Sequence, residues 1–412
     1  MLNVVDGSLF AFGQNMVSRT TVLPVLVTKI GGDNVAVSLL GVIWVLGFYF
    51  PQVFIAGYAQ RVPEKKRLVL LTAFLQRIPW LLLAIVSFLL LNRVGAGLEL
   101  ALFFAAFALA AVTGSLNLPG WFDLVAKITP VGLRGRLFAS RAIAGGLLGV
   151  LAGWIAVQVL SRLTYPQSFG LLFALAFVVM MGSYAALSFL VEDRTEVPSR
   201  PLHFRDFFAR FPEIIRTERN YRNYLVAEAL LMTATIADAF YTVNAFRRFH
   251  LSAVYAGRFT IVFMVGAVIG SLVFGTLADR VGHRVNLIIC AASTALACLV
   301  AITAANVYVY CLAFVGSAFA VNLLQISRLP FLAEVCGERD RPTYVALASM
   351  VTSPFVLLGL GAGWVANRAG YAPVFIIIGA VAACAALWLI AMVQEPRRLR
   401  PSLEPSSPGS DT

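Results

Sequence analysis

The sequence predicts an all-α polytopic membrane protein with twelve transmembrane helices, and three observations lead to this fold class. The 412 residues are 60% hydrophobic and 13% charged, with a mean hydropathy of +0.85, whereas soluble domains are about half apolar and a quarter charged. The apolar residues gather in runs of about 20, the length that a helix needs to cross a bilayer. Most of the 32 Lys and Arg residues lie in short links between these runs, as membrane topology requires.

The apolar runs divide the chain into twelve segments. The first is the weakest span, because Asp6, Gln14, Asn15 and Arg19 interrupt it. The eleventh contains Pro354, which is expected to kink it because proline removes a backbone hydrogen bond. We expect helices at approximately 4–28, 35–57, 68–91, 98–118, 137–160, 168–191, 221–246, 254–277, 285–305, 307–330, 343–366 and 371–393.

One long link separates six segments from the next six. Its aromatic and aliphatic residues recur at helical spacing, which predicts a short amphipathic helix on the membrane surface, with an ordinary linker as the alternative. These residues are Phe204, Phe207, Phe208, Phe211 and Ile215. We therefore expect an N-terminal six-helix bundle (1–191), a cytoplasmic central loop with the amphipathic helix (192–220), a C-terminal six-helix bundle (221–396) and a disordered tail rich in Pro and Ser (397–412).

The distribution of positive charge predicts the orientation. The even-numbered links and the tail carry most of the Lys and Arg residues, while the odd-numbered links carry few, such as Lys29 and Arg93. Cytoplasmic loops are enriched in these residues, so both termini are expected in the cytoplasm. Residues 1–10 contain Asp6 and no basic stretch, so we expect no removable signal peptide.

Composition argues against several other classes of function. The net charge of +12 lies in short turns, without a basic stripe interleaved with aromatic residues, so a nucleic-acid partner is not expected. The five Cys residues form no CxxC pair, and His203, His250 and His283 are isolated. We expect no metal site, no cofactor and no enzymatic activity.

A charged stretch between the eighth and ninth segments is the most specific motif. It reads Gly-Thr-Leu-Ala-Asp-Arg-Val-Gly-His-Arg from Gly275 to Arg284. Asp279 falls at the C-terminal end of a helix, where a carboxylate is unfavourable unless a cation or another helix N-terminus answers it. The alternative is a solvated loop Asp beside Arg280 and Arg284.

This stretch resembles the signature loop of the major facilitator superfamily of secondary transporters. In that family the motif lies between helices 2 and 3, with a weaker copy between helices 8 and 9, and it helps to hold the cytoplasmic side closed. Here the copy after helix 2 has Gln60 in place of the Asp, and His283 replaces the usual Arg or Lys of the second copy. The resemblance makes Gly275, Asp279, Arg280, Gly282 and Arg284 an inner-gate motif.

The resemblance also implies a partner for this gate. Asp279 is expected to dock near the start of helix 5, where Arg134, Arg136 and Arg141 cluster. The opposite contact, from the link after helix 2, is expected to be weaker because that link lacks the Asp. Neutralising Asp279 should then shift the protein toward an inward-open state.

Polar residues inside the spans concentrate on four helices, the first, fourth, seventh and tenth. A buried polar group in lipid is costly and usually faces protein or water. The resemblance implies that these four helices line a central cavity. The candidate residues for substrate or proton binding are Gln14, Asn15, Arg19, Asn117, Glu228, Asp238, Asn322 and Gln325.

Two carboxylates, Glu228 and Asp238, lie within the seventh segment. Desolvation there favours the protonated form, so either could bind and release a proton during transport. The alternative is a structural pair, for example Asp238 with Arg19. Arg19 is otherwise placed to meet an anionic substrate, and Arg77 in the third segment is expected to pair structurally or to reach the interface.

The fifth segment carries a row of small residues, Gly145, Gly146, Gly149 and Gly153, which favours close helix packing. It has no Pro, and the fourth segment has no Arg. Drug antiporters of the superfamily typically have a Gly-Pro element and an Arg there, so the chain departs from their pattern.

We therefore predict a secondary transporter that moves a small organic solute by alternating access, with proton-coupled export favoured. The protein is expected to be a monomer in a bacterial-type inner (plasma) membrane, with the lipid bilayer, a small-molecule substrate and protons as its partners. The alternative is a non-transporting membrane sensor or scaffold that retains the fold, which the degenerate first motif copy favours.

Overall fold

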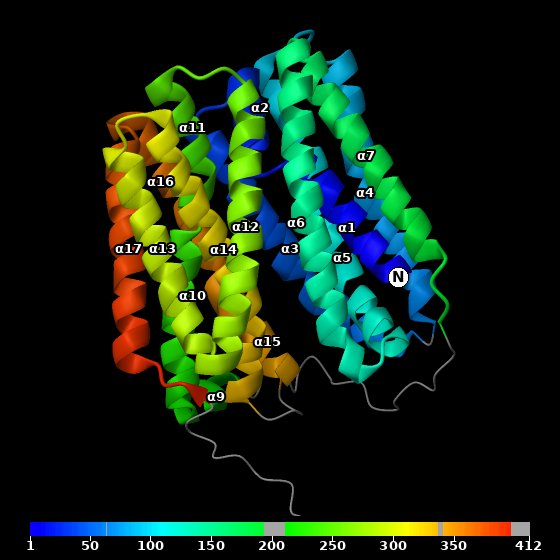
Figure 1. Cartoon of the computed structure of the whole chain (residues 1–412), viewed down its shortest axis with the longest axis vertical. Helices are drawn as coiled ribbons and strands as arrows, with labels where there is room; N and C mark the ends of the chain where they lie inside the picture. The colour runs from blue at the N-terminus through cyan, green and yellow to red at the C-terminus, as the bar shows by residue number, and fades with distance from the viewer. Residues whose placement is uncertain (63, 193–210, 337–340, 397–412) are drawn as a thin grey trace, which may run out of the picture.

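The computed structural model describes residues 1–62, 64–192, 211–336 and 341–396, and this part of the chain is helical throughout (Figure 1). The N-terminal half comprises α1 (Leu2–Met16), α2 (Leu23–Ile30), α3 (Asn34–Arg61), α4 (Lys65–Leu89), α5 (Ala96–Ile128), α6 (Val131–Arg162) and α7 (Gln167–Ser188). The C-terminal half comprises α9 (Phe211–Thr217), α10 (Arg219–Ala234), α11 (Ala237–Phe249), α12 (Val254–Val281), α13 (His283–Thr303), α14 (Val307–Val335), α15 (Arg341–Thr352), the 3₁₀ turn η1 (Ser353–Leu357), α16 (Leu358–Ala369) and α17 (Tyr371–Met392).

Eleven candidate membrane spans are found among the described residues, and the first expected segment is not one of them. Its place is taken by two shorter helices, α1 and α2, separated by residues 17–22. Polar residues stand in this break, and the backbone oxygen of Ser18 accepts hydrogen bonds from both Val22 and Leu23, each at 2.9 Å. Pro24 stands in the first turn of α2, where proline is tolerated. The outward-facing apolar side chains of the spans, such as Leu147 and Leu296, are the kind of surface that a membrane covers.

Two further expected helices are also interrupted. The seventh segment consists of α10 and α11, separated by Thr235 and Ile236. The hydroxyl of Thr235 donates to the backbone oxygen of Met232 at 2.7 Å, a local bond that competes with regular helix geometry. The eleventh segment is interrupted at η1, which contains Pro354, in agreement with the expected kink.

Buried apolar side chains form one core that joins the halves and smaller cores within each half. The largest core includes residues from both halves, for example Leu26 and Phe173 with Phe240 and Phe375. A second core lies among α10, α13, α14 and α17, and a third lies among α4, α5 and α7. The halves are thus packed together toward the end that carries α2 and α11, at the top of Figure 1.

Two helix pairs form the seam between the halves: α6 packs along α12, and α3 packs along α16. Glycines allow the backbones to approach. A Cβ atom added at Gly153 would lie 2.9 Å from the backbone oxygen of Gly257, and one at Gly363 would lie 2.6 Å from the backbone oxygen of Asn34. The expected packing role of the glycine row is therefore seen at Gly153.

The central link is described only in part. Residues 193–210 lie outside the described residues, and so do Phe204, Phe207 and Phe208 of the expected amphipathic helix. Helix α9 occupies the end of that stretch, with Ile214 buried. The surface helix stays a prediction, and the tail 397–412 also lies outside the described residues.

Candidate functional site

Arg19 lies in the break between α1 and α2. Its guanidinium carbon is 4.0 Å from the ring centroid of Trp44 on α3. The side chain is solvent-accessible although protein atoms surround it. Among the residues that the structure describes, Arg19 has no hydrogen-bond or ion-pair partner. A charged side chain at this depth is costly without a partner, so the break presents an unsatisfied cation between the halves.

Asp238 stands at the corresponding place in the other half, in the first turn of α11 just after the break that follows α10. A helix N-terminus favours a carboxylate. The hydroxyl of Ser317 on α14 donates to Oδ1 of Asp238 at 2.6 Å. Arg19 and Asp238 attract each other electrostatically, yet they do not form an ion pair. The structure thus brings these two predicted residues into one neighbourhood without joining them.

Hydrogen bonds between the halves hold the first break in position. The hydroxyl of Thr242 on α11 donates to the backbone oxygen of Thr20 at 2.6 Å. The hydroxyls of Thr21 and Thr260 lie 2.5 Å apart. The two residues that follow Arg19 are therefore anchored to α11 and α12.

Aromatic rings of α3 and α5 flank Arg19. Trp44 stacks on Phe48 with ring centroids 5.7 Å apart, and Phe107 lies 6.0 Å from Trp44. Trp44 and Phe48 are both partly exposed. A cation, a carboxylate and an apolar aromatic wall therefore lie near the breaks. The sequence analysis missed Trp44 and Ser317, because neither carries a charge and nothing in the spacing links them to Arg19 or Asp238.

Glu228 does not join this site. Nε of Arg328 on α14 donates to Oε1 of Glu228 at 2.6 Å, and Nη2 of Arg328 donates to the hydroxyl of Ser349 at 3.0 Å. The hydroxyl of Thr352 lies 3.4 Å from the same Glu228 oxygen. Both members of the ion pair are buried, so Glu228 belongs to a structural pair within the C-terminal half. Nothing in the sequence identified Arg328 as the partner of Glu228.

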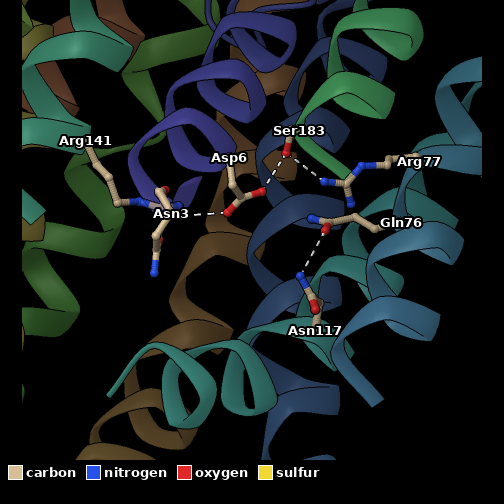
Figure 2. A network of polar contacts seen from close by, with 7 residues as sticks. All are labelled: Asn3, Asp6, Gln76, Arg77, Asn117, Arg141 and Ser183. Atoms are coloured by element: carbon tan, nitrogen blue, oxygen red, sulfur yellow. Dashed lines mark hydrogen bonds and ion pairs between the residues drawn. The ribbon is translucent and has the colours of Figure 1, made fainter. Parts of the chain in front are cut away.

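The N-terminal half holds its own chain of charged contacts, which Figure 2 shows. Nη2 of Arg77 donates to the hydroxyl of Ser183 at 2.9 Å, and that hydroxyl donates to Oδ1 of Asp6 at 2.7 Å. Nη1 of Arg141 lies 3.4 Å from Oδ2 of Asp6 and also contacts Asn3. The expected structural pairing of Arg77 is therefore what the structure shows. Asp6, one of the residues that interrupt the first expected span, is buried and contacts α6 and α7.

Two other candidate residues bond within their own halves. Asn117 on α5 accepts a hydrogen bond from Thr72 at 3.1 Å, and its Nδ2 lies 3.5 Å from Oε1 of Gln76, as Figure 2 shows for the latter pair. Asn322 on α14 donates to the backbone oxygen of Ala267 at 2.6 Å and to Ser271 at 2.8 Å. Both residues tie neighbouring helices together in this conformation.

Three candidates have no hydrogen-bond partner among the described residues, namely Gln14, Asn15 and Gln325. Gln325 is exposed, and Asn15 faces α6, where a Cβ atom added at Gly149 would lie 2.9 Å from its amide nitrogen. Their roles in binding stay predictions.

The signature stretch connects α12 to α13 and contacts the end of α17. Gly282 has φ +104°, a left-handed conformation that favours glycine. The backbone nitrogen of Arg284 donates to Oε2 of Glu395 at 3.0 Å, and its guanidinium donates to the backbone oxygens of Leu389 at 3.0 Å and Ile390 at 2.6 Å. A cation at the last carbonyls of a helix is stabilising. Arg284 thus fastens α13 to α17 within the C-terminal half.

The contact expected between Asp279 and the start of α6 stays a prediction. The side chains of Asp279 and Arg134 lie outside those described. Arg136 is exposed, and Arg141 contacts Asn3 and Asp6 in this conformation. Arg280 is exposed, and a Cβ atom at Gly275 would meet no heavy atom within 4 Å among the described residues.

Each half carries an acidic cap of its own, which the sequence did not reveal. Glu192, which follows α7, accepts from the backbone nitrogens of Lys65 at 3.2 Å and Lys66 at 2.7 Å, and from Nζ of Lys127 at 2.8 Å. Burial alone would raise the pKa of Glu192, but these three hydrogen bonds hold it below its ordinary value. Glu395 caps the start of α13 in the same way. The shared signal was an acidic residue shortly after the last helix of each half.

Comparison with known proteins shows which family and which fold the chain resembles. The family model described as Major Facilitator Superfamily matches residues 229–410, the half that carries the better motif copy. A D-xylose-proton symporter structure superposes with a TM-score of 0.71 at 16% identity, covering 96% of this chain and 97% of that one. The chain is thus similar to the major facilitator superfamily over its C-terminal half, and it has the fold of this symporter along nearly its whole length. Its fold is that of secondary transporters, and the resemblance of the Gly275–Arg284 stretch is confirmed.

Other similar proteins show that the likeness of fold covers nearly the whole chain. A mutant of the nucleoside transporter NupG has a TM-score of 0.71 at 13% identity, covering 95% of this chain and 99% of that one. A bacterial homolog to the human lysosomal transporter Spinster, in an inward-facing and unoccupied conformation, has a TM-score of 0.67 at 12% identity, with 98% of each chain covered. At these identities the likeness shows the fold alone. The uncharacterized protein Rv2209 of Mycobacterium tuberculosis is 21% identical over 434 residues, covering 96% of this chain and 77% of the relative.

Proposed function

We propose that this chain moves a small organic solute across the membrane by alternating access at the site between Arg19 and Asp238, in exchange for protons. The observation that carries the proposal is the unpaired, accessible Arg19 in a helix break, with Asp238 at the matching break of the other half. Discontinuous helices whose ends meet near the bilayer midplane are a common way of building transporter sites. In this proposal α1 and α2 together form the first of twelve spans.

The contacts between the halves support an inward-facing conformation. The hydrogen bonds that join the halves among the described residues lie toward the α2 and α11 end. Four residues there, Asp33, Asn34, Asn367 and Tyr371, form what we call the outer clasp. Asn367 accepts from the backbone nitrogen of Asn34 at 3.1 Å and donates to Asp33 at 2.7 Å, and Tyr371 donates to Asn34 at 2.6 Å.

The positive-inside rule gives this clasp its side of the membrane. Basic residues concentrate at the opposite end, so both termini face the cytoplasm and the clasp faces outward. The site is then reached from the cytoplasm in this conformation. We place the protein, as a monomer, in a bacterial-type inner membrane.

Asp238 is the proposed proton carrier. Asp238 accepts one side-chain hydrogen bond, from Ser317, and stands at the junction of the halves. Glu228, by contrast, forms a hydrogen-bonded ion pair with Arg328. A carboxylate that binds either a proton or part of the solute couples the two by competition. With a proton gradient directed inward, such exchange drives the solute out of the cell.

The test uses the purified full chain in liposomes with an internal pH dye, screened against a panel of solutes. We expect a solute-dependent pH change that Asp238→Asn and Arg19→Gln abolish. Arg368→Gln is a matched control, because Arg368 also lies over a tryptophan ring, that of Trp364 at 4.5 Å, but is exposed outside the site. Glu213→Gln on α9 is the control for the carboxylate.

Each other outcome revises the proposal in a defined way. Solute movement without a pH change that still requires Arg19 would remove proton coupling and keep transport. Movement that both site variants retain would contradict the site. No movement of any solute, in a protein that remains folded, would favour the membrane sensor or scaffold.

A further inference from the structure

We infer that the central site binds a zwitterion, a small solute that carries an anionic group for Arg19, a cationic group for Asp238 and an apolar or aromatic part. The inference rests on the proposed function, since it names the class of solute that the transport site accepts. Amino acids and short peptides are the simplest compounds with this arrangement.

The first argument is that two opposite charges are present and neither is neutralised. Arg19 and Asp238 are close enough to attract each other, but they form no ion pair. Elsewhere in this protein, paired charges are in contact: Arg328 and Glu228 meet at 2.6 Å. Arg19 and Asp238 are accessible rather than buried, and intramembrane charges that face a cavity mark substrate or ion pathways, so two unpaired opposite charges between the halves indicate a ligand that supplies both counter-charges.

The second argument concerns what holds the two groups apart. Thr20 and Thr21, the two residues that follow Arg19 in the break, are bonded to Thr242 and Thr260, so the chain next to Arg19 is held in place. Asp238 is oriented by Ser317 on α14, and among the described residues its second carboxylate oxygen has no hydrogen-bond partner. The guanidinium of an arginine has five N–H donors and can bind a carboxylate through two parallel hydrogen bonds. Each charged group is therefore held in place with unused hydrogen-bonding capacity.

The third argument is the neighbourhood of Arg19. Its guanidinium lies over Trp44, which continues through Phe48 as a stacked pair. A cation–π contact offsets part of the cost of burying Arg19 but leaves the edge of the guanidinium free for a hydrogen-bonding partner. The same rings offer an apolar surface to a solute side chain. A solute with both charges and an apolar part satisfies all three elements.

Solutes with a different arrangement of charge leave Arg19, Asp238 or both without a counter-charge. A simple anion would pair with Arg19 but would bring negative charge close to Asp238, and a simple cation would do the reverse. A neutral polyol would leave both charges without a counter-ion. Only a dipolar solute neutralises the two groups together.

The test compares compounds that differ only in their charged groups. The zwitterions are the twenty common amino acids and dipeptides made from them. The matched probes include L-phenylalanine, 3-phenylpropionate, which lacks the amine, and 2-phenylethylamine, which lacks the carboxylate. Binding to the purified full chain is measured by the change in tryptophan fluorescence and by the shift in thermal unfolding temperature.

We expect at least one zwitterion to bind, and its single-charge analogues to bind about tenfold or more weakly. The two variants should change specificity in opposite directions. In Asp238→Asn the carboxylate-only analogue should bind as well as the zwitterion, and in Arg19→Gln the amine-only analogue should do so. A residue with only a structural role would weaken all three probes alike, and Arg368→Gln should change none of them.

Single-charge analogues that bind wild-type protein as tightly as the zwitterions, or no binding by any zwitterion, would overturn the inference. Its failure differs from failure of the proposed function. An anion that is transported in an Arg19-dependent way would refute the zwitterion and leave transport standing. Zwitterion binding without movement across liposomes would keep the binding site and refute transport.

Discussion

In the N-terminal half, a serine hydroxyl links charged side chains in a network of four residues from four helices. The C-terminal half has one direct ion pair instead. Arg77, Ser183, Asp6 and Arg141 form the first arrangement, and Glu228 with Arg328 forms the second. The hydrogen bonds and ion pairs of each arrangement stay within one half, although Arg328 also lies over the ring of Tyr49 on α3, 5.2 Å from its centroid. The breaks of the two halves show the opposite behaviour, since Arg19 and Asp238 each lack an ionic partner. Paired charges therefore stabilise a single half, whereas Arg19 and Asp238 lie between the halves without an ionic partner among the described residues.

The largest expected effect is on the direct ion pair. Glu228→Ala leaves Arg328 buried without its counter-charge, and we expect a loss of about 3–5 kcal/mol in the free energy of unfolding, because breaking one side of a buried pair is strongly destabilising. Thermal unfolding of the purified protein measures it. If the variant unfolded like wild type but lost transport, Glu228 would belong to the transport site.

A smaller loss is expected from the serine-linked chain. Asp6→Asn keeps the size of the side chain but removes its charge, while Arg77 retains bonds to the backbone oxygens of Met180 at 2.7 Å and Ala73 at 2.6 Å. We expect a loss of about 1–3 kcal/mol, as for a hydrogen bond to a charged group. A loss as large as that of Glu228→Ala, measured in the same way, would show that the remaining hydrogen bonds of Arg77 do not compensate for the lost charge of Asp6.

The seam between the halves gives the third prediction, on conformation. In Gly363→Ala the new methyl group would press on the backbone oxygen of Asn34, at a cost of about 1–3 kcal/mol to the packed state. We expect the outer end to open about tenfold more often. The measure is labelling of a cysteine placed at Thr260, using a reagent that cannot cross the membrane. Gly361→Ala is the control on the same helix, since its methyl group meets no heavy atom within 4 Å. Equal labelling in both variants would contradict the predicted role of this contact.

The unpaired charges should affect stability least while affecting function most. Arg19→Gln and Asp238→Asn remove no ion pair, so we expect the free energy of unfolding to stay within about 1 kcal/mol of wild type, while solute exchange in liposomes is lost. Strong destabilisation of both variants would mean that Arg19 and Asp238 stabilise the fold. The distinction between paired charges that stabilise the protein and unpaired charges that bind a solute would then be wrong.

The smallest effect concerns the cap at Glu192. Its pKa is lowered in the folded protein, so its contribution to stability is present above the ordinary glutamate pKa of about 4.3 and is lost as the pH falls through the lower, folded-state value. Glu192→Gln should therefore flatten the fall in unfolding temperature below that pH. Glu213→Gln, on the exposed helix α9, should leave the slope unchanged.

The long uniform helices were the most predictable part of the fold. The expected segments at 285–305 and 371–393 correspond to α13 (His283–Thr303) and α17 (Tyr371–Met392), because uninterrupted apolar runs have one stable form in a bilayer. The breaks at residues 17–22 and at Thr235 were not predicted. Serine and threonine side chains compete for backbone hydrogen bonds, but whether they break a helix depends on partners such as Thr242, which comes from the other half.

The sequence predicted which residues are candidates for the site, but not which of them form ion pairs with one another. Polar bias in the spans identified Arg19, Asp238 and Glu228 as unusual, since each is costly in lipid. Nothing in their spacing showed that Glu228 meets Arg328, 100 positions later. Asp6 reaches Ser183 over an even longer separation. Such contacts depend on which helices become neighbours.

The sequence by itself determined a polytopic membrane protein, because a bilayer requires long apolar segments with their backbone bonds satisfied internally. The Gly275–Arg284 stretch added a specific resemblance to the major facilitator superfamily. Only the tertiary structure decided which charges are neutralised. Glu228 and Asp238 look alike in the sequence, both carboxylates in one apolar span. Packing places an arginine 2.6 Å from the first and leaves the second near an arginine with which it forms no ion pair. That difference is the reason for proposing Asp238, and not Glu228, as part of the transport site.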